Sequence, residues 1–464
     1  MSLAPGPLSA LTLKHALETG ETTSVTLTRA LLRRIAADTS THSVCTTEAE
    51  RALASAAAAD ARRAAGKPLG PLDGLPMTVK DAMRVAGSRT TWGLSLYRSH
   101  VPRQSSRAFA VLEEQGVVLL GRTTVPRGSF DWNGRGQVFA PCTHPQDPSR
   151  SPGGSSAGAA AAIAAGLSPL DVGTDIAGSI RVPCHFCGVA GLRTTDGWLP
   201  IDDIAPEGSP AGFARLVTLG PIARDVPDLE LLLDAWASAL PYAERPLADG
   251  PLAVTWALDG LNADERTRNA MRDWLEGREV VEVSPDLDFA ELFAVWGLIA
   301  GFEFSRGLPW YARNPLFRWL WGRFMVQSRL GQGPLSTHFR RGLLASQREY
   351  EAALATQALA QSTMDDFLGR YQAWVLPVCP GSAPLLALEG KTIDGESYTR
   401  WHGTFNCPTA VLGTPALSVP LPVEGMPIGV QIHGRRFSDR ALVRRFSDVS
   451  APHVRHTSPA PYPE

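Results

Sequence analysis

The order of apolar and polar positions along the 464-residue chain predicts alternating helices and strands. Leucine and alanine recur at helical spacing through residues 8–65, which indicates a group of N-terminal helices. Short continuous apolar runs at 75–80 and 116–121 are typical of buried strands. Helical patterns at 109–115 and 157–166 lie among such runs, and this alternation favours an α/β fold.

The pattern changes after about residue 225, where helices dominate. The remaining segments expected to be regular are a strand at 170–173, helices at 229–240, 262–278, 287–303, 338–370 and 439–446, and strands at 252–256, 373–378, 415–420 and 428–432. Glycine and proline are spread evenly, so we expect one domain over 1–464. Its expected parts are N-terminal helices at 1–68, a core at 69–225, a variable helical insertion at 240–370 and a C-terminal part of the core at 371–464.

Composition narrows the class of protein. Hydrophobic residues make up 44% of the chain and charged residues 19%, which is ordinary for a soluble globular protein. The net charge of −2 favours neither a nucleic-acid partner nor an anionic membrane. The longest apolar run, near 292–302, is too short for stable membrane insertion. Few cysteines and no N-terminal targeting pattern predict a cytoplasmic protein.

The six cysteines include one close pair, Cys184 and Cys187. A structural zinc site needs four ligands, and no second cysteine pair or paired histidines follow. We therefore expect two small buried residues here and no metal.

Candidate chemistry concentrates between Ser151 and Pro183, where two glycine-rich turns carry serines. The first turn holds Ser155 and Ser156, and the second holds Ser179. The segment 173–175 reads as a further turn between them. A serine in such a turn is usually a structural residue, yet free backbone N–H groups beside it would suit a nucleophile.

Lys80 ends the apolar run at 75–80 and precedes Asp81. A buried lysine loses its proton more readily, because burial disfavours the charged form, and a neutral lysine can activate a serine hydroxyl. The alternative is a strand-end lysine that reaches solvent or pairs with Asp81.

Two other catalytic motifs fit poorly. The Gly-x-Ser-x-Gly pattern at 154–158 would place a nucleophile elbow at Ser156, but the Pro- and Ser-containing segment 147–152 cannot be the buried strand that such an elbow requires. No Lys-Ser or Lys-Thr pair closes the glycine-rich segment, so it is not a phosphate-binding loop.

Taken together, these residues resemble the amidase signature family of serine hydrolases. The sequences Val79-Lys80-Asp81, Gly153–Gly158 and Gly173–Pro183 follow in order the VKD, GGSSGG and GTDxGGSIRxP motifs of that family. Segments 70–76, 413–416 and 426–431 are similar to its flanking motifs. Residues from about 240 to 370 match none of its motifs, and substrate specificity varies in this part of such enzymes.

The resemblance implies an α/β fold with a large mixed twisted β-sheet, covered by helices on both faces, and a helical insertion. It implies hydrolysis of a linear, non-peptide amide without a cofactor. Ser179 would be the nucleophile, Ser155 would follow a cis peptide bond and relay a proton, and Lys80 would be the neutral base.

Further roles follow from the resemblance. The backbone N–H groups of Ile176, Ala177 and Gly178, together with that of Ser179, would form the oxyanion hole. Ser129 and Asp131 would lie on the segment that lines the acyl pocket. Alanines stand at 157 and 177 where the family has glycine, and a left-handed backbone at 177 would be incompatible with alanine.

Two alternatives to an independent amidase stay open at this point: a glutaminase-like subunit of a transamidation complex, and a non-catalytic interaction protein on the same fold. The expected partner is a small-molecule amide, and a homodimer is compatible with the sequence. The aromatic and basic stretch 310–321 is expected to pack its rings on the core, with a surface for apolar substrates or membrane as the alternative.

Overall fold

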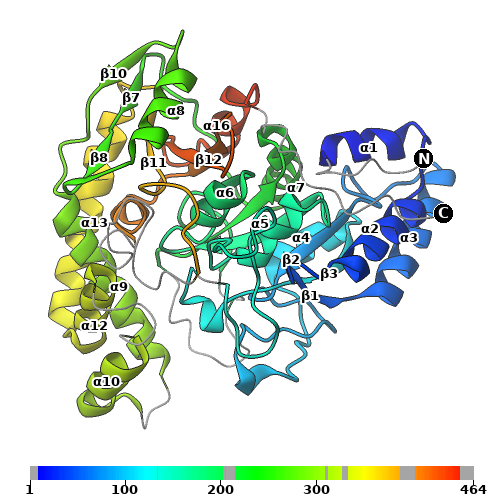
Figure 1. Ribbon diagram of the computed structural model, residues 1–464, viewed down its shortest axis with the longest axis horizontal. Coiled ribbons are helices and arrows are strands. Elements are labelled where there is room, and N and C mark those ends of the chain that lie inside the picture. The colour runs from blue at the N-terminus through cyan, green and yellow to red at the C-terminus, as the bar shows by residue number, and fades with distance from the viewer. Residues whose placement is uncertain are drawn as a thin grey trace.

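The computed structural model describes residues 9–132, 134–201, 204, 215–308, 312–326, 333–386 and 403–449. Its central feature is an eight-stranded mixed sheet, which confirms the predicted α/β class (Figure 1). In sheet order its strands are β10 (Val280–Glu282), β7 (Leu252–Val254), β11 (Ala373–Pro377), β13 (Gly429–His433), β12 (Ala416–Pro420), β5 (Ala190–Arg193), β6 (Thr218–Ala223) and β4 (Leu170–Asp175).

A second, three-stranded sheet lies beside the edge strand β4. Its strands, in order, are β1 (Val44–Thr47), β3 (Val118–Thr123) and β2 (Pro76–Lys80). The hydroxyl of Thr78 on β2 donates a 2.6 Å hydrogen bond to Asp171 on β4, which joins the two sheets at this edge. The carboxyl end of β2, and with it Lys80, therefore lies next to the carboxyl end of β4. A separate two-stranded hairpin consists of β8 (Ala257–Leu258) and β9 (Leu261–Asn262).

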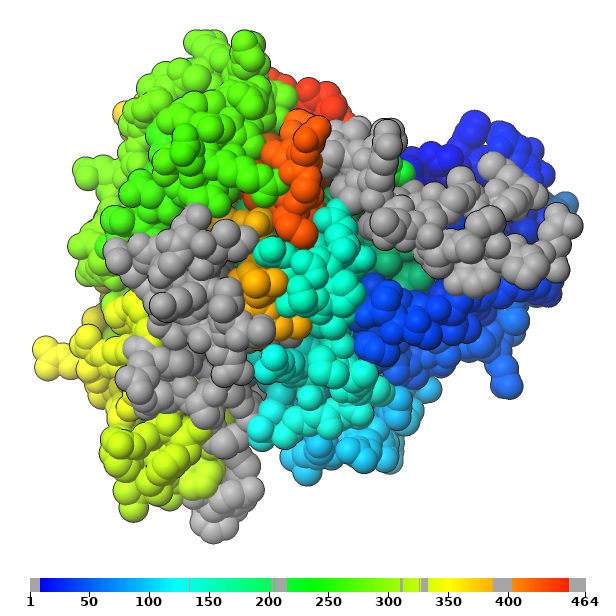
Figure 2. Space-filling model, in the orientation of Figure 1, coloured from blue at the N-terminus to red at the C-terminus, as the bar shows by residue number. Residues whose placement is uncertain are grey.

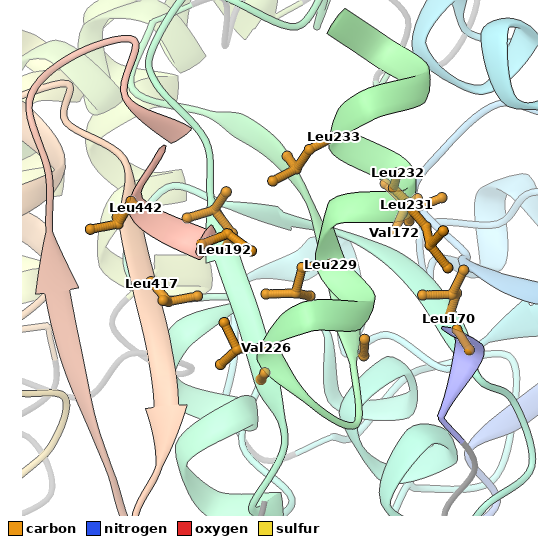
Figure 3. Close-up of a cluster of buried hydrophobic side chains, with 14 of the residues drawn as sticks. Leu170, Val172, Leu192, Val226, Leu229, Leu231, Leu232, Leu233, Leu417 and Leu442 are labelled. Carbon is orange, nitrogen blue, oxygen red and sulfur yellow. The ribbon is translucent and has the colours of Figure 1, made fainter. Parts of the chain in front are cut away.

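Helices cover both faces of the large sheet, as predicted. Strand β11 shows why: Ala373 and Val375 join one hydrophobic cluster, whereas Trp374 and Leu376 join another. Alternate side chains of a strand point to opposite faces, so a strand that is apolar throughout needs cover on both sides. In Figure 3, leucines of the helix α7 (Glu230–Ala239) and its preceding turn pack with Leu192 and Leu417 of the sheet.

The other described helices come from several parts of the chain. The N-terminal part contributes α1 (Ala10–Glu18), α2 (Ser24–Ala37), α3 (Ala49–Ala64) and α4 (Arg107–Glu114). The middle and C-terminal parts contribute α5 (Ala157–Ala164), α6 (Arg181–Cys187), α8 (Glu265–Leu275), α15 (Cys407–Val411) and α16 (Asp439–Arg445). The expectation of two small buried residues at Cys184 and Cys187 is confirmed, because both lie buried in α6 as free thiols.

The region 240–370 is less purely helical than expected. The strand expected at 252–256 is confirmed as β7, and β10, which was not expected, pairs with it in the large sheet. Its long helices are α9 (Phe289–Gly307), α12 (Pro334–Leu344) and α13 (Gln347–Phe367), with the shorter α10 (Pro315–Trp321), and together they form the left side of the molecule in Figure 1.

Three local predictions were wrong. The segment 173–175, read as a turn, is the end of β4, because glycine and threonine there continue the ladder with β6. The single helix expected over 338–370 is two helices, since Ser346 caps α13 and forms a capping box with Glu349. Strand β1 lies inside the region expected to be helical throughout.

The aromatic and basic stretch also departs from expectation. Residues 310 and 311 lie outside the described residues, but α10 exposes Leu316, Phe317, Trp319 and Leu320 to solvent. The packing on the core expected for this stretch is therefore wrong for α10, where Trp321 is the residue that stacks inward on Phe304. Among the described residues, no helix is both long enough and apolar enough to cross a bilayer.

Candidate active site

Lys80 lies at the end of β2, fully shielded from solvent. Its Nζ is 2.8 Å from the Oγ of Ser155 and 2.7 Å from the Oγ1 of Thr174. The alternative of a lysine that reaches solvent is excluded by this burial. Pairing with Asp81 is not the arrangement either, because both oxygens of that carboxylate accept hydrogen bonds from Thr91.

Burial lowers the pKa of Lys80 to about 7, because desolvation disfavours the ammonium form. The nearby carboxylates of Asp175 and Asp171 offset part of that shift. Burial also raises the pKa of Asp171 to about 7, against the opposing hydrogen bonds from Thr78 and Thr123. A substantial fraction of Lys80 is therefore neutral near pH 7, with an Nζ lone pair available to accept a proton.

Ser155 is placed by the glycine-rich turn before α5. The Gly154–Ser155 peptide bond is cis. Glycine is needed at 154, since a Cβ there would lie 2.6 Å from the backbone oxygen of Asp131. This close approach brings the segment around Asp131 against the turn that aims the Ser155 hydroxyl at Lys80.

Ser179 lies in the short connection between β4 and α6. The backbone N–H of Ser156 donates a 3.0 Å hydrogen bond to the carbonyl of Ser179, so the two serine-bearing turns are directly connected. Ser179 retains 5% exposure, whereas Ser155 retains 1% and Ser156 none, so Ser179 is the most accessible of the three. The side chains of Lys80 and Ser155 are thus in direct contact. Ser179 is connected to the turn that carries Ser155 by a backbone hydrogen bond.

A buried ion pair between Asp175 and Arg181 holds the connection that carries Ser179. The guanidinium of Arg181 lies 2.9 Å from Asp175, and neither side chain is exposed. Arg181 also donates to Thr409 at 2.9 Å and to Gln431 at 2.8 Å. Burial alone would raise the pKa of Asp175, but the positive charges of Arg181 and Arg193 hold it well below its usual range.

Replacing Arg181 by methionine is expected to lower the free energy of unfolding by about 3–5 kcal/mol, because the buried Asp175 would lose its hydrogen-bonded partner and keep only Arg193, 3.9 Å away, as a counter-charge. Urea unfolding of the two full-length proteins measures the difference. Arg440→Met is the matched control, since its pair with Asp234 is partly exposed and is worth about 1 kcal/mol or less. Equal losses in both variants would contradict a structural role for the Asp175–Arg181 pair.

The predicted oxyanion hole needs one correction. The N–H of Gly178 donates to Asp175 at 2.9 Å, so this amide is already engaged and is not free to bind an oxyanion. Gly178 has a φ of +97°, and a Cβ there would lie 2.7 Å from Asn406, so glycine is required for shape. Ala177 does not have a positive φ, which explains why alanine is accepted where the family has glycine.

Ser129 and Asp131, predicted to line an acyl pocket, flank Phe130. Ser129 has a φ of 59°, and its Oγ is buried without a hydrogen-bond partner among the described residues. The Phe130 ring makes edge contacts with Phe304 and Phe339 of the region 240–370, at centroid distances of 5.7 and 5.5 Å. The segment therefore lies between the Ser155 turn and the helices of that region.

Sequence reasoning missed three residues of the site. Thr174, which contacts Lys80, lies within the GTD motif and could have been found there. Asn406 packs against Gly178 from the C-terminal part of the chain. Trp296 on α9 donates a 2.8 Å hydrogen bond to the carbonyl of Ile176, and no motif in that region signals it. No group of three His, Cys, Asp or Glu side chains within the described ranges could hold a metal ion.

The structure is thus a mixed-sheet α/β fold with a buried lysine against the serine of one glycine turn and a second serine turn beside it, an arrangement that agrees with an amidase-type architecture. The chain belongs to the amidase family, whose model, described as Amidase, matches residues 26–248 and 318–443. The family model does not match residues 249–317, which lie inside the region where the sequence carries no family motif.

Relatives and solved structures agree with this assignment. A glutamyl-tRNA(Gln) amidotransferase subunit of Geobacter metallireducens is 33% identical, covering 93% of this chain and 94% of that protein. The protein of the same name from Roseiflexus sp. is 32% identical over 93% of each chain. A crystal structure of an amidase aligns with a TM-score of 0.78 and 28% identity, covering 94% of this chain and 98% of the other. A chain from a vestigial protein complex related to the origins of an s-triazine catabolic enzyme aligns with a TM-score of 0.79 and 26% identity, covering 96% and 99%.

Proposed function

We propose that this protein hydrolyses a carboxylic amide to a carboxylate and ammonia or an amine, through an acyl-enzyme on Ser179. The observation that carries the proposal is the 2.8 Å contact between the buried Lys80 Nζ and Ser155 Oγ. The next residue, Ser156, donates a backbone hydrogen bond to the carbonyl of Ser179. A lysine whose pKa burial lowers to about 7 suits a general base, because it can take a proton at neutral pH and return it.

In the first half of the reaction, the Ser179 Oγ attacks the amide carbon while its proton passes to Ser155, and the proton of Ser155 passes to Lys80. The negative charge develops on the former carbonyl oxygen, where the backbone N–H groups of Ile176, Ala177 and Ser179 would bind it. Collapse breaks the carbon–nitrogen bond as Lys80 returns its proton through Ser155 to the leaving nitrogen. This leaves the acyl group as an ester on Ser179.

In the second half, water replaces the amine and attacks the ester carbon. Ser155 and Lys80 accept one water proton by the same path and return it to Ser179 as the carboxylic acid leaves, and the acid then loses its remaining proton to solvent. No step needs a metal or an organic cofactor, since the lysine supplies the base, the serines supply the nucleophile and the relay, and the backbone amides stabilise the oxyanion. Ser129 and Asp131, on the segment beside the Ser155 turn, are proposed to contact the acyl group.

A second candidate function is that of the glutamine-hydrolysing subunit of an amidotransferase. The observation in its favour is that the relatives at 32–33% identity are named as glutamyl-tRNA(Gln) amidotransferase subunits. The same Lys80, Ser155 and Ser179 would then release ammonia for a partner protein. A non-catalytic protein on this fold has no comparable support, because such a protein has no need of a lysine buried against a serine.

One experiment separates the first two functions. The purified full-length chain is offered glutamine and a panel of aliphatic and aromatic carboxamides, anilides and esters, and both ammonia or amine and carboxylate are quantified. We expect the chain alone to turn over at least one of the amides other than glutamine. The second function is supported instead if glutamine is the sole amide cleaved, and if cleavage appears after the remaining subunits of an amidotransferase are added. No turnover under either condition would contradict both.

A further inference from the structure

The helix α10 and the helical turn that follows it, Gly322–Val326, present an apolar surface to solvent; we call residues 313–324 the α10 face. Its exposed apolar side chains are Leu316, Phe317, Trp319, Leu320 and Phe324. Leu316 is 66% exposed and Phe324 62% exposed, values typical of polar surface residues. Leu316, Leu320 and Phe324 recur every fourth position, the spacing that favours one side of a helix. In Figure 2 this segment forms yellow-green surface at the lower left.

The α10 face is also strongly basic. Residues 313–324 contain three arginines and no aspartate or glutamate, although the whole chain has a net charge of −2. Arg313 and Arg323 are exposed at the two ends of the face. The Arg323 guanidinium lies 5.7 Å from the centre of the Trp319 ring, so charge and aromatic surface are held together.

The apolar side chains are displayed by an anchored helix. Trp321 stacks on Phe304 of α9 with a centroid distance of 4.7 Å, and Arg318 donates a 2.9 Å hydrogen bond to the carbonyl of Leu343 on α12. Asn314 caps the helix by accepting from the N–H of Phe317. Contacts on one side thus fix α10 to the molecule while the opposite side keeps its leucines and aromatic rings in water.

We propose that the α10 face binds the surface of an anionic lipid membrane, with the helix lying in the plane of the interface. Leucine and aromatic side chains gain free energy on entering the boundary between headgroups and acyl chains, and tryptophan is favoured there. Arginines beside them gain from anionic headgroups while their alkyl stems remain in contact with apolar surface. The association is peripheral, and it is independent of which amide the active site hydrolyses.

Two other occupants fit the face less well. A second copy of this chain in a two-fold contact would bring the arginines of one α10 face against those of the other, and like charges would repel. A nucleic acid would satisfy Arg313 and Arg323 but would leave Leu316, Leu320 and Phe324 against a polar, hydrated backbone. An anionic lipid surface satisfies both the charge and the apolar side chains.

Flotation of the full-length protein with lipid vesicles tests the proposal. We expect it to float with vesicles that contain phosphatidylglycerol and to stay behind with pure phosphatidylcholine. The double variant Arg313→Gln/Arg323→Gln is expected to lower the partition coefficient by about tenfold or more. Leu316→Ser/Phe324→Ser is expected to abolish flotation.

Matched controls come from surfaces elsewhere on the chain. Arg29→Gln/Arg33→Gln removes two exposed arginines from α2, and Leu359→Ser removes a 70% exposed leucine from α13. Both are expected to float as the wild type does, and thermal unfolding checks that every variant is folded. Failure of the wild type to float on anionic vesicles, or equal loss in the controls, would overturn the proposal. So would a dimer in light scattering that Leu316→Ser/Phe324→Ser converts to monomer, or tighter binding to RNA than to anionic vesicles.

Discussion

Replacing Ser179 by alanine is expected to lower kcat/KM for amide hydrolysis by at least about 10⁴-fold, because the proposed reaction has no path to an acyl-enzyme without that hydroxyl. The same change is expected to abolish covalent labelling by a fluorophosphonate, which reacts with activated serines. Intact-mass spectrometry measures the label, and peptide mapping of the wild type is expected to place it on Ser179. The most accessible of the three serines at the site is thus expected to be the one modified.

Two further variants make this result specific. Ser155→Ala is expected to slow labelling strongly while the label still attaches to Ser179, because the relay is broken but the nucleophile remains. Ser99→Ala, at an exposed loop position, is expected to react as the wild type does. Full labelling of Ser179→Ala, or a label mapped to Ser156, would contradict the assignment of the nucleophile.

Replacing Lys80 by methionine is expected to lower kcat/KM by about 10³-fold, since general acid–base catalysis typically contributes factors of 10²–10⁴. Methionine keeps much of the length of the side chain but cannot accept a proton. The wild-type pH profile carries the complementary expectation. Because the neutral amine is the active form and burial lowers the pKa of Lys80 to about 7, kcat/KM is expected to rise as the pH increases through about 7 and to level off above it.

The Lys80→Met variant is expected to be more stable than the wild type near neutral pH. The Lys80 pKa is about 7 when folded and near 10.5 when unfolded, so between these values the unfolded chain binds more protons. The free energy of unfolding of the wild type therefore rises with pH between about 7 and 10.5. Below pH 7 the cost of burying the ammonium is present in full. Methionine removes that cost, offset in part by lost hydrogen bonds to Ser155 and Thr174, for a net gain of about 2 kcal/mol.

Urea unfolding at several pH values measures this gain. Lys67→Met is the matched control, because Lys67 is exposed and its substitution is expected to change neither stability nor activity appreciably. A Lys80→Met protein that is less stable than the wild type at pH 7, or a wild-type pH profile that is flat through 7, would contradict a buried, partly neutral lysine at this site.

Local pattern predicted much of the fold because most elements carry their own signal. The apolar runs that became β2, β3 and β11 were found within two residues of their observed ends. Strand β1 was missed because its sequence, Val-Cys-Thr-Thr, is short and half-buried, and pairing with β3 decides its conformation. The helix break before α13 was missed because a capping box at Ser346 is a weak signal inside a long helical pattern.

At the candidate site, the motifs pointed to Lys80, Ser155 and Ser179 but could not assign their contacts. The Gly178 amide looked free in the sequence, whereas the ion-paired Asp175 occupies it in the structure. Trp296 reaches the carbonyl of Ile176 from 120 residues away, a distance in sequence at which no local pattern operates. The exposure of α10 was also beyond the sequence, since aromatic residues at helical spacing look the same whether they face the core or water.

The sequence by itself determined the α/β class and the family, and it pointed to the three side chains proposed to react, because glycine turns and an apolar strand ending in lysine are local features. The tertiary structure alone decided that Lys80 is buried against Ser155, a residue 75 positions away, and that the two serine turns are hydrogen-bonded. It also decided that the Gly178 amide is engaged, because the ion pair with Arg181 fixes where the Asp175 carboxylate lies. The protonation of Lys80 follows from such contacts as well, because a pKa depends on what surrounds the group in space rather than on its neighbours along the chain.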